Sequence, residues 1–301
     1  MSIKKIFYKL TNPEKYQEYK TNISIKNKIN WYKSTFEKKI TDIQKKIETQ
    51  KELSFLHSGH LGDVIDSLAV VKELSKTHKC NFYVEANKFI DVKYNKHPGG
   101  NVFLNNKMVN MLLPLLQKQN FITTVEIYKN QKIDIDLNLF KDLAMNLGLG
   151  SVRWYFQLTG VHADLSEPYL FVEPHQKIKN KIAILRTKRR NNYLVNYKFL
   201  SKYDNLIFIG LKDEYESLKN EVHNLEYYEC INFLEIAEII KSSKFFLGNL
   251  CFGYSIAEGL KVPRLLESVS EFSSMHPTGN NAYEFYFQGH FEKWFDHLYN
   301  L

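Results

Sequence analysis

The stretch Leu53-Ser-Phe-Leu-His-Ser-Gly-His-Leu-Gly-Asp-Val-Ile-Asp-Ser-Leu68 decides the fold of this chain. An apolar, strand-like run ends in a loop of small residues, and an amphipathic helix follows with Asp63 at its start. Open α/β sheets bind ligands where the carboxyl end of a parallel strand faces a helix amino terminus. The sequence therefore predicts a binding site at this junction.

Asp63 has two interpretations. Gly62 lets the chain turn sharply while a ligand approaches, so Asp63 is a candidate general base for a substrate hydroxyl. Alternatively, Asp63 is an amino-terminal helix cap, a task that Asp66 can share. His57 and His60 flank the loop, and we interpret them as hydrogen-bonding residues rather than metal ligands, with His60 as a candidate substrate contact.

Composition indicates a folded α/β protein of two domains. The 301 residues are 44% hydrophobic and 14% aromatic, and no stretch approaches the roughly 20 apolar residues that span a bilayer. The amino terminus lacks the apolar core of a signal peptide. Three cysteines lie far apart, which predicts reduced thiols, a cytoplasmic location and no metal site: Cys80, Cys230 and Cys251.

Almost all of the net charge lies at one end of the chain. Residues 1–50 hold twelve lysines and five acidic residues, which accounts for +7 of the total +8. This imbalance favours contact with an anionic membrane surface or an acidic glycan lipid, and the alternative is a solvated helix face. The segment has no arginine and no known binding motif, so nucleic acid is not an expected partner.

A long amphipathic helix is expected over roughly residues 25–50 of this basic extension. It packs on the body of the protein or pairs with a second copy, so a homo-oligomer is one expectation. The pattern is an apolar stripe at spacings of three and four residues, made of Ile25, Ile29, Tyr32, Phe36, Ile40, Ile43 and Ile47.

Beyond residue 50, short apolar runs alternate with helical patterns. We expect two Rossmann-like, doubly wound domains, at 51–174 and 175–285, facing a cleft. Residues 286–301 form a docking helix. Ile133-Asp-Ile-Asp-Leu137 alternates like a strand with one polar face, which we prefer to a metal-binding interpretation.

Two motifs in the second domain are candidate anion sites. Arg186-Thr-Lys-Arg-Arg-Asn-Asn192 follows a strand, and its cations suit a diphosphate. In Phe245–Pro263, a strand passes through a tight turn into a helix, so its amides are suited to phosphate or sugar. Candidate substrate-binding residues are Gly62, His60, Arg186, Lys188, Arg189, Gly248, Asn249, Gly253, Tyr254, Ser255 and, for ribose hydroxyls at the end of the next strand, Glu267.

Together these pieces resemble the heptosyltransferase-like glycosyltransferases (glycosyltransferase family 9 and relatives), which have the two-domain GT-B fold. The resemblance covers roughly residues 52–270 and is most specific at Ser58–Leu68 and Gly248–Pro263. It implies that Asp63 is the catalytic base and that Arg186 or Lys188 faces the nucleotide diphosphate. Ser255 stands where the family has a histidine.

We therefore expect a glycosyltransferase that moves a sugar from a nucleotide-diphosphate sugar to a hydroxyl of a glycan or lipid-linked acceptor. Inversion at the anomeric carbon and independence of metal are expected, with no cofactor besides the nucleotide-sugar co-substrate. The protein is expected in the cytoplasm or at the inner face of the membrane. The alternatives are a nucleotide-sugar epimerase on the same fold and a non-catalytic binding or scaffold protein.

Overall fold

A computed structural model describes residues 3–90, 97–142, 149–272 and 274–301. The chain divides into two compact units, Met1–Thr49 and Gln50–Leu301. Within the described residues, every helix is too short or too polar to cross a bilayer.

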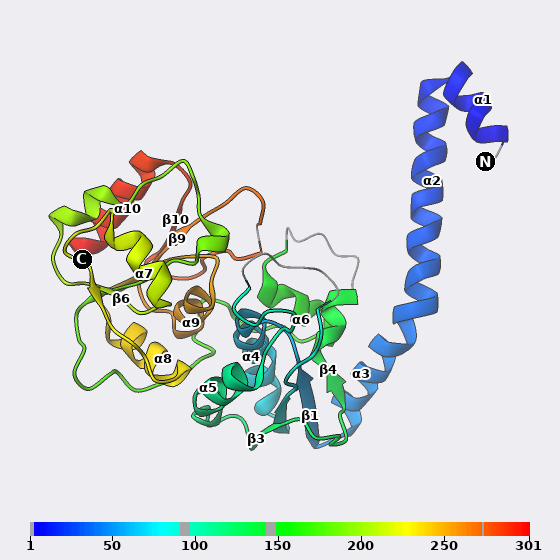
Figure 1. Cartoon of the computed structure of the whole chain (residues 1–301). Coiled ribbons are helices and arrows are strands. Elements are labelled where there is room, and N and C mark those ends of the chain that lie inside the picture. The colour runs from blue at the N-terminus through cyan, green and yellow to red at the C-terminus, as the bar shows by residue number, and fades with distance from the viewer. Residues whose placement is uncertain (1–2, 91–96, 143–148, 273) are drawn as a thin grey trace. The chain divides into compact units, whose positions relative to one another are not determined.

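The described part of the first unit, residues 3–49, is helical except at Asn12 (Figure 1). It consists of α1 (Ile3–Thr11), α2 (Pro13–Trp31), a π-helical turn (Tyr32–Phe36) and α3 (Glu37–Thr49). The side chain of Asn12 accepts a hydrogen bond from the Lys15 amide at 2.9 Å, and Pro13 follows it, which is a strong start signal for α2.

The predicted apolar stripe does not run unbroken along this unit. Ile25, Ile29 and Tyr32 are exposed, whereas Phe36 is buried and its ring lies 5.1 Å from that of Trp31. A π-turn adds a residue to one turn of helix and so rotates the following residues onto a different face. The periodicity of the sequence does not reveal that insertion.

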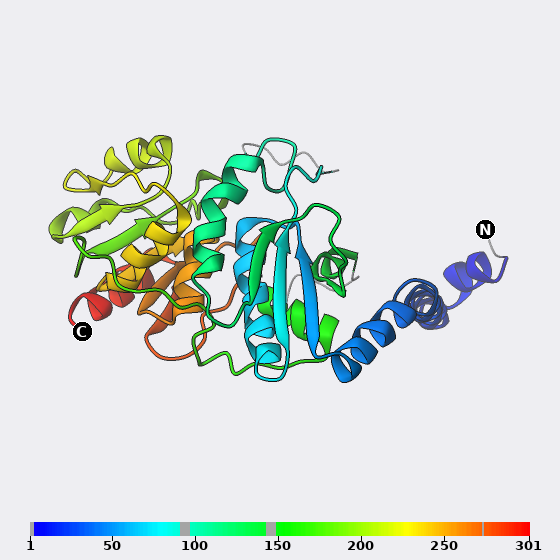
Figure 2. The ribbon, with the colours of Figure 1, turned by 90° about the horizontal axis from the view of Figure 1, so that it is seen from below.

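The second unit contains two parallel sheets covered by helices (Figures 1 and 2). The first has the order β3-β2-β1-β4, and its strands are β1 (Glu52–His57), β2 (Lys79–Val84), β3 (Thr124–Ile127) and β4 (Ile135–Asp136). Its helical segments are α4 (Leu61–Ser75), α5 (Asn106–Gln117), a 3-10 helix (Leu137–Asp142) and α6 (Ser151–Thr159).

The second sheet has the order β10-β9-β8-β5-β6-β7. Its strands are β5 (Ile182–Leu185), β6 (Leu206–Phe208), β7 (Glu226–Tyr227), β8 (Phe245–Asn249), β9 (Arg264–Glu267) and β10 (Ala282–Phe285). Strands β5, β8 and β9 are buried along their whole length, as expected for a parallel sheet covered on both faces. Helical segments are Lys188–Arg190, Lys198–Lys202, α7 (Lys212–Lys219), α8 (Phe233–Ser242), α9 (Phe252–Leu260) and α10 (Gln288–Tyr299).

All strand pairs in both sheets are parallel, which confirms the predicted α/β class with two doubly wound sheets. Each sheet reverses its strand order once, between β1 and β4 in the first and between β5 and β8 in the second. Ligands bind at the carboxyl ends of strands at such switch points. Helix α4 follows β1 and helix α9 follows β8, so each begins at one of these points.

Helices α4 and α9 pack against each other and join the two sheets (Figure 1). A methyl group added at Gly62 would lie 2.9 Å from the hydroxyl oxygen of Ser255, so the helices nearly touch there. The connection between the sheets is tied to the same place, because the amides of Tyr169 and Leu170 both donate to the Gly259 carbonyl, at 2.9 and 3.1 Å.

Some local expectations differ from the structure. The helix expected over 139–160 is a 3-10 turn and the short α6, and residues 143–148 lie outside the described ones. Strand β10 was not predicted, because Ala282–Phe285 is only half-buried and its polar residues weaken the pattern. Pro114 lies inside α5, where a kink or an end was expected.

The close packing around β8 gives a stability prediction. A methyl group at Gly248 would lie 2.8 Å from the carbonyl oxygen of Leu185, a backbone atom that cannot move aside. We expect Gly248→Ala to lower the free energy of unfolding by about 1–3 kcal/mol. The matched control is Gly289→Ala in α10, where nothing lies within 4 Å. It should leave stability unchanged or raise it by up to about 1 kcal/mol. Chemical denaturation measures both, and equal effects would contradict the packing argument.

Candidate functional site

Both switch points open onto one cavity of about 1260 Å³, here named the central cavity. Single small-molecule sites usually measure roughly 300–1,000 Å³, so this cavity has room for two substrates. It is lined by the last residue of β4 and by residues that follow β1, β4, β5 and β8: His60, Gly62, Asp63, Asp136, Asn138, Lys141, Thr187, Arg189, Arg190, Leu250, Cys251 and Phe252.

A chain of hydrogen bonds fixes the loop that carries Asp63. The Gly59 amide donates to His57 Nδ1 at 2.9 Å, so the proton of that ring lies on Nε2. His57 Nε2 bonds the hydroxyl of Tyr155 at 2.9 Å, and this hydroxyl donates to the Asp63 carbonyl at 2.9 Å. Burial, followed by the charge of Lys141, holds the pKa of His57 well below its usual value. His57 is therefore a neutral structural residue.

The two aspartates of the Ile133–Leu137 motif support the same loop. Asp136 Oδ1 accepts from the amide and the side chain of Asn138, at 2.9 and 2.7 Å. Asn138 in turn accepts from the Ser58 amide at 2.8 Å. Asp134 accepts from the Ser54 amide at 3.0 Å. In the described parts of the chain, no group of three or more His, Cys, Asp or Glu side chains is placed to hold a metal ion.

Asp63 occupies the third position of α4 and is half-buried at the wall of the central cavity. Its Oδ2 accepts the His60 amide at 3.1 Å, which is a helix cap, and no described residue donates to Oδ1. Burial raises the pKa of Asp63 to about 6, against the opposing effects of Lys141 and the His60 amide. One carboxylate thus serves as the cap and still presents an oxygen of raised basicity.

His60 also lines the cavity, and its surroundings are strongly cationic. Its ring lies 4.8 Å from that of His97 and 5.0 Å from that of Phe103. Burial and the charges of Lys141, Arg189 and Arg190 lower the pKa of His60 to about 4. His60 is therefore neutral at physiological pH, and the surrounding potential favours an anionic ligand.

Lys141 is a cavity residue that the sequence reasoning missed. Its ammonium lies 3.5 Å from the centre of the Phe103 ring, and burial lowers its pKa to about 8 while Asp63 raises it. It follows β4, the strand at the switch point of the first sheet. A two-residue strand gives little pattern, so the only available signal was its position just after the Ile133–Leu137 motif.

The structure pairs Arg186 with Glu267, away from the cavity wall. Arg186 donates to both carboxylate oxygens of Glu267, from Nε at 2.7 Å and from Nη2 at 2.8 Å. Tyr197 donates its hydroxyl to the same carboxylate at 2.7 Å, and Glu267 is fully buried. Neither residue of this ion pair lines the central cavity. The diphosphate role expected for Arg186 and the ribose role expected for Glu267 have no support in this arrangement.

The other cations of the loop that follows β5 point in different directions. Lys188 points to the surface, where its ammonium lies 3.0 Å from Asp213. Arg189 and Arg190 line the cavity, and the guanidinium of Arg190 lies 3.2 Å from the centre of the Phe272 ring. Arg190 belongs to the cationic motif expected to suit a diphosphate, whereas Phe272 was not among the expected site residues.

The expected residues around α9 are mostly structural. Asn249 is fully buried and clamps the cationic loop: its Oδ1 accepts the Thr187 amide at 3.0 Å, and its Nδ2 donates to the carbonyls of Thr187 and Arg190, at 2.8 and 3.0 Å. Gly248 and Gly253 give close packing against Leu185 and Phe246. Tyr254 is buried away from the cavity, whereas Ser255 borders it beside Gly62.

The first turn of α9 reaches the cavity directly. Cys251 is its amino-terminal cap residue and Phe252 its first residue, and both line the central cavity together with Leu250. The first amides of a helix have no partner within the helix, and the helix dipole places partial positive charge there. With Arg189 and Arg190 nearby on the same wall, this end of the cavity is suited to a phosphorylated ligand.

No family model matches this sequence, and no curated protein matches it. Solved structures with a similar course of the backbone include the E. coli ADP-heptose LPS heptosyltransferase II, at 10% identity and a TM-score of 0.49 over 83% of this chain and 98% of that one. A glycosyl transferase family 9 protein from Veillonella parvula DSM 2008 has 10% identity and a TM-score of 0.48 over 72% and 80%. A putative UDP-N-acetylglucosamine 2-epimerase from Listeria monocytogenes has 11% identity and a TM-score of 0.41 over 72% and 79%.

The raised pKa of Asp63 gives a pH-dependent stability prediction. The pKa is about 6 in the folded protein and 3.8 for an ordinary aspartate, so the folded state binds the proton more tightly. The ionised carboxylate therefore lowers stability above about pH 6, and this effect disappears as the pH falls to about 4. Asp63→Asn should be more stable than the wild type by about 1–2 kcal/mol at pH 8 and equal to it at pH 4. Thermal unfolding across this range measures the difference, and a constant difference would contradict the assignment.

Proposed function

We propose that this protein is a glycosyltransferase that uses a nucleotide-diphosphate sugar and a hydroxyl acceptor. The observation that carries the proposal is the convergence of both switch points on one cavity. Asp63, after β1, and Arg189 and Arg190, after β5, all line it. A base facing an anion site across a space for two substrates is the arrangement that transfer of a group from a diphosphate requires.

In the proposed reaction, Asp63 takes the proton of the acceptor hydroxyl. The acceptor oxygen attacks the anomeric carbon, the bond from that carbon to the diphosphate oxygen breaks, and the diphosphate leaves with the electron pair. Attack from the side opposite the leaving group inverts the anomeric configuration. With a pKa of about 6, the carboxyl is mostly ionised at pH 7 and is a stronger base than an ordinary aspartate.

The departing diphosphate gains negative charge, and we assign its stabilisation to Arg189, Arg190 and the first turn of α9. Arginine is suited to bidentate contact with phosphate, and the amides of the helix end add donors that need no reorganisation. With these cations in place, no metal is required in the proposal. The acceptor, a glycan or lipid-linked hydroxyl, occupies the part of the cavity near Asp63.

The proposal is tested first by binding and then by turnover. Thermal-shift screening against nucleoside diphosphates and their sugars should identify a donor. Asp63→Asn should keep nucleotide binding within about twofold and lower transfer by about 10²–10⁴-fold, because only proton removal is lost. Arg190→Met should weaken nucleoside diphosphate binding by about tenfold or more. Lys188→Met, at the surface, is the matched control and should change neither.

Three results would contradict this proposal. One is the absence of binding to any member of the nucleotide panel. Another is retention of most turnover by Asp63→Asn. The third is conversion of the nucleotide sugar without an acceptor, which would indicate an epimerase.

We further propose that the basic first unit contacts an anionic membrane surface, where a lipid-linked acceptor lies. Three apolar side chains of α1 are exposed, namely Ile6, Phe7 and Leu10, at 45%, 60% and 79%. Lys5 and Lys9 lie in the same helix. Exposed apolar residues interleaved with lysines are typical of helices that lie in the membrane interface.

The expected result is co-sedimentation with vesicles that contain phosphatidylglycerol but not with pure phosphatidylcholine. Phe7→Ser with Leu10→Ser should reduce binding by about tenfold or more, because most of the apolar contact is lost. Leu301→Ser, which removes an exposed apolar residue at the other end of the chain, is the control. Binding that survives the double substitution would contradict the role of α1, and concentration-dependent self-association lost in that variant would assign the face to a second copy.

A further inference from the structure

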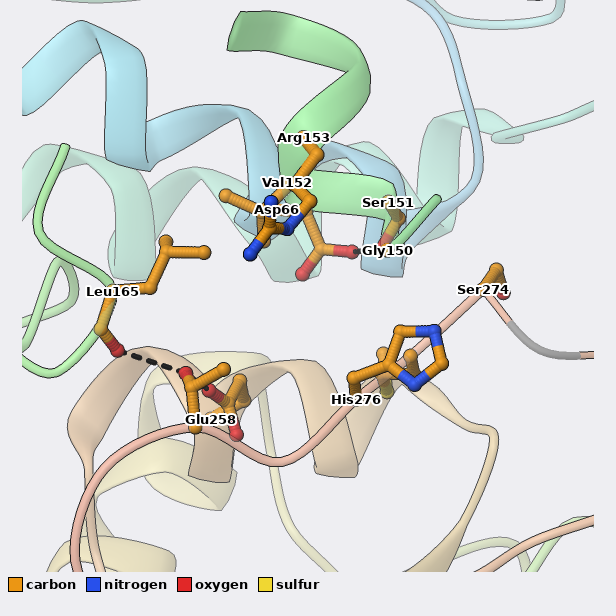
Figure 3. A pocket seen from close by; sticks show the side chains of 11 residues that line it. Asp66, Gly150, Ser151, Val152, Arg153, Leu165, Glu258, Ser274 and His276 are labelled. Atoms are coloured by element: carbon orange, nitrogen blue, oxygen red, sulfur yellow. Dashed lines mark hydrogen bonds between the residues drawn. The ribbon is translucent and has the colours of Figure 1, made fainter. Parts of the chain in front are cut away.

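A smaller pocket of about 140 Å³ lies where α4, α6, α9 and the segment 274–278 meet (Figure 3). We name it the Asp66 pocket. It shares four lining residues with the central cavity, so the two spaces adjoin: Asp66, Ser151, Ser274 and Met275. Asp66 lies in the Ser58–Leu68 stretch, where the sequence predicted only a helix-capping role for it.

The pocket is lined by the buried carboxyl group of Asp66. Asp66 is 2% exposed, and the hydroxyl of Ser151 donates to its Oδ2. The other oxygen, Oδ1, points into the pocket in Figure 3, and the hydroxyl of Ser255 is the second side-chain group that interacts with this carboxyl. Burial raises the pKa of Asp66 to about 7. The hydroxyls of Ser151 and Ser255 oppose the shift, and the charges of Asp63 and Glu258 add to it. Near neutral pH this carboxyl both donates and accepts hydrogen bonds.

Glu258, the second carboxylate of the pocket, has all the partners it needs. Its Oε2 accepts from Arg264 Nε at 2.6 Å, and its Oε1 accepts from Thr278 at 2.6 Å and from Lys261. It is 4% exposed. Glu258 therefore holds α9 to the segment that follows β9. Asp66 differs from it because its hydrogen-bond partners among the described residues are hydroxyl groups rather than cations.

Two other lining residues supply hydrogen-bond donors. Arg153 and His276 are exposed and line the pocket, together with the apolar Val152 and Leu165. An engineered cavity of about 150 Å³ holds a six-membered ring such as benzene, so this volume suits one ring. Because its walls offer a carboxyl, a guanidinium and an imidazole, the fitting ring is one that carries hydroxyl groups.

The pocket lies next to the proposed reaction centre. Asp66 is one helical turn beyond Asp63 on α4, and residues three apart share a face. Along α9, Phe252 and Ser255 border the central cavity, and Glu258, one turn further, borders the pocket. A ligand whose phosphates lie at the start of α9 would extend along this helix toward the pocket.

From this juxtaposition we propose that the Asp66 pocket binds the sugar ring of the nucleotide-sugar donor. Asp66 hydrogen-bonds one of the ring hydroxyls, and Arg153 bonds another. The inference rests on the proposed glycosyltransferase function and adds the residues that select the sugar. The alternative is a purely structural role. In that case Asp66 only accepts the hydrogen bond from the Ser151 hydroxyl at the amino terminus of α6, where a negative charge is favourable.

Isothermal titration calorimetry at pH 7 separates the two accounts. The probes are the nucleoside diphosphates UDP, ADP and GDP and the nucleotide sugars UDP-glucose, ADP-glucose and GDP-mannose. The diphosphate and the matching nucleotide sugar that bind the wild type are then titrated into each variant. Asp66→Ala and Arg153→Met should each weaken the nucleotide sugar about tenfold, the effect of about one lost hydrogen bond. Each should leave the nucleoside diphosphate within about twofold. Asp66→Asn should recover most of the loss, because an amide also donates and accepts.

Lys188→Met is the control and should change neither affinity. Arg153 is exposed and makes no contact that holds α6, so Arg153→Met keeps the test valid if Asp66→Ala does not fold. Equal loss for both ligands, or no loss for either, would overturn the sugar site and leave the proposed function standing. A wild type that binds none of the six probes would overturn both.

Discussion

The packing of α4 against α9 is the constraint on which the candidate site depends. Each helix begins at the switch point of its own sheet, and the absence of a side chain at Gly62 lets them approach until Ser255 is in contact. The connecting segment is tied to Gly259 on the same α9. For this reason the strand-end loops of both sheets line one cavity, and neither sheet alone would bring Asp63 and the two arginines to the same space.

The same packing brings two carboxyl groups into a poorly solvated place. Asp63 and Asp66 lie one turn apart on α4. If both were ionised, the repulsion between the two negative charges would destabilise the folded protein. Their surroundings separate them: Lys141 and the His60 amide favour the ionised form of Asp63, while Asp63 and Glu258 disfavour that of Asp66. Two nearby carboxyls with different pKa values, about 6 and about 7, can divide the roles of base and hydrogen-bond donor.

Local sequence predicts the parts of this structure that local interactions determine. The buried strands β5, β8 and β9 read as apolar runs, and the Gly-Asp pair before an amphipathic helix located Asp63 at the cavity. Partners far apart in the chain were not predictable. Ser151 meets Asp66 across 85 residues, and Arg186 meets Glu267 across 81. No periodicity encodes such pairs, so Asp66 was interpreted only as a cap and Arg186 as a phosphate ligand.

The cationic loop after β5 shows why charge at a strand end does not by itself identify a ligand contact. Glu267 is fully buried, and its negative charge would strongly destabilise the fold without a bidentate partner. Arg186 forms that ion pair and is therefore not free to bind a ligand. Asn249 fixes the same loop through its backbone. These two restraints determine which way the following residues face, and Arg189 and Arg190 reach the cavity as a result. The positions of Arg189 and Arg190 therefore depend on Arg186 and Glu267, although neither of these two residues borders the cavity.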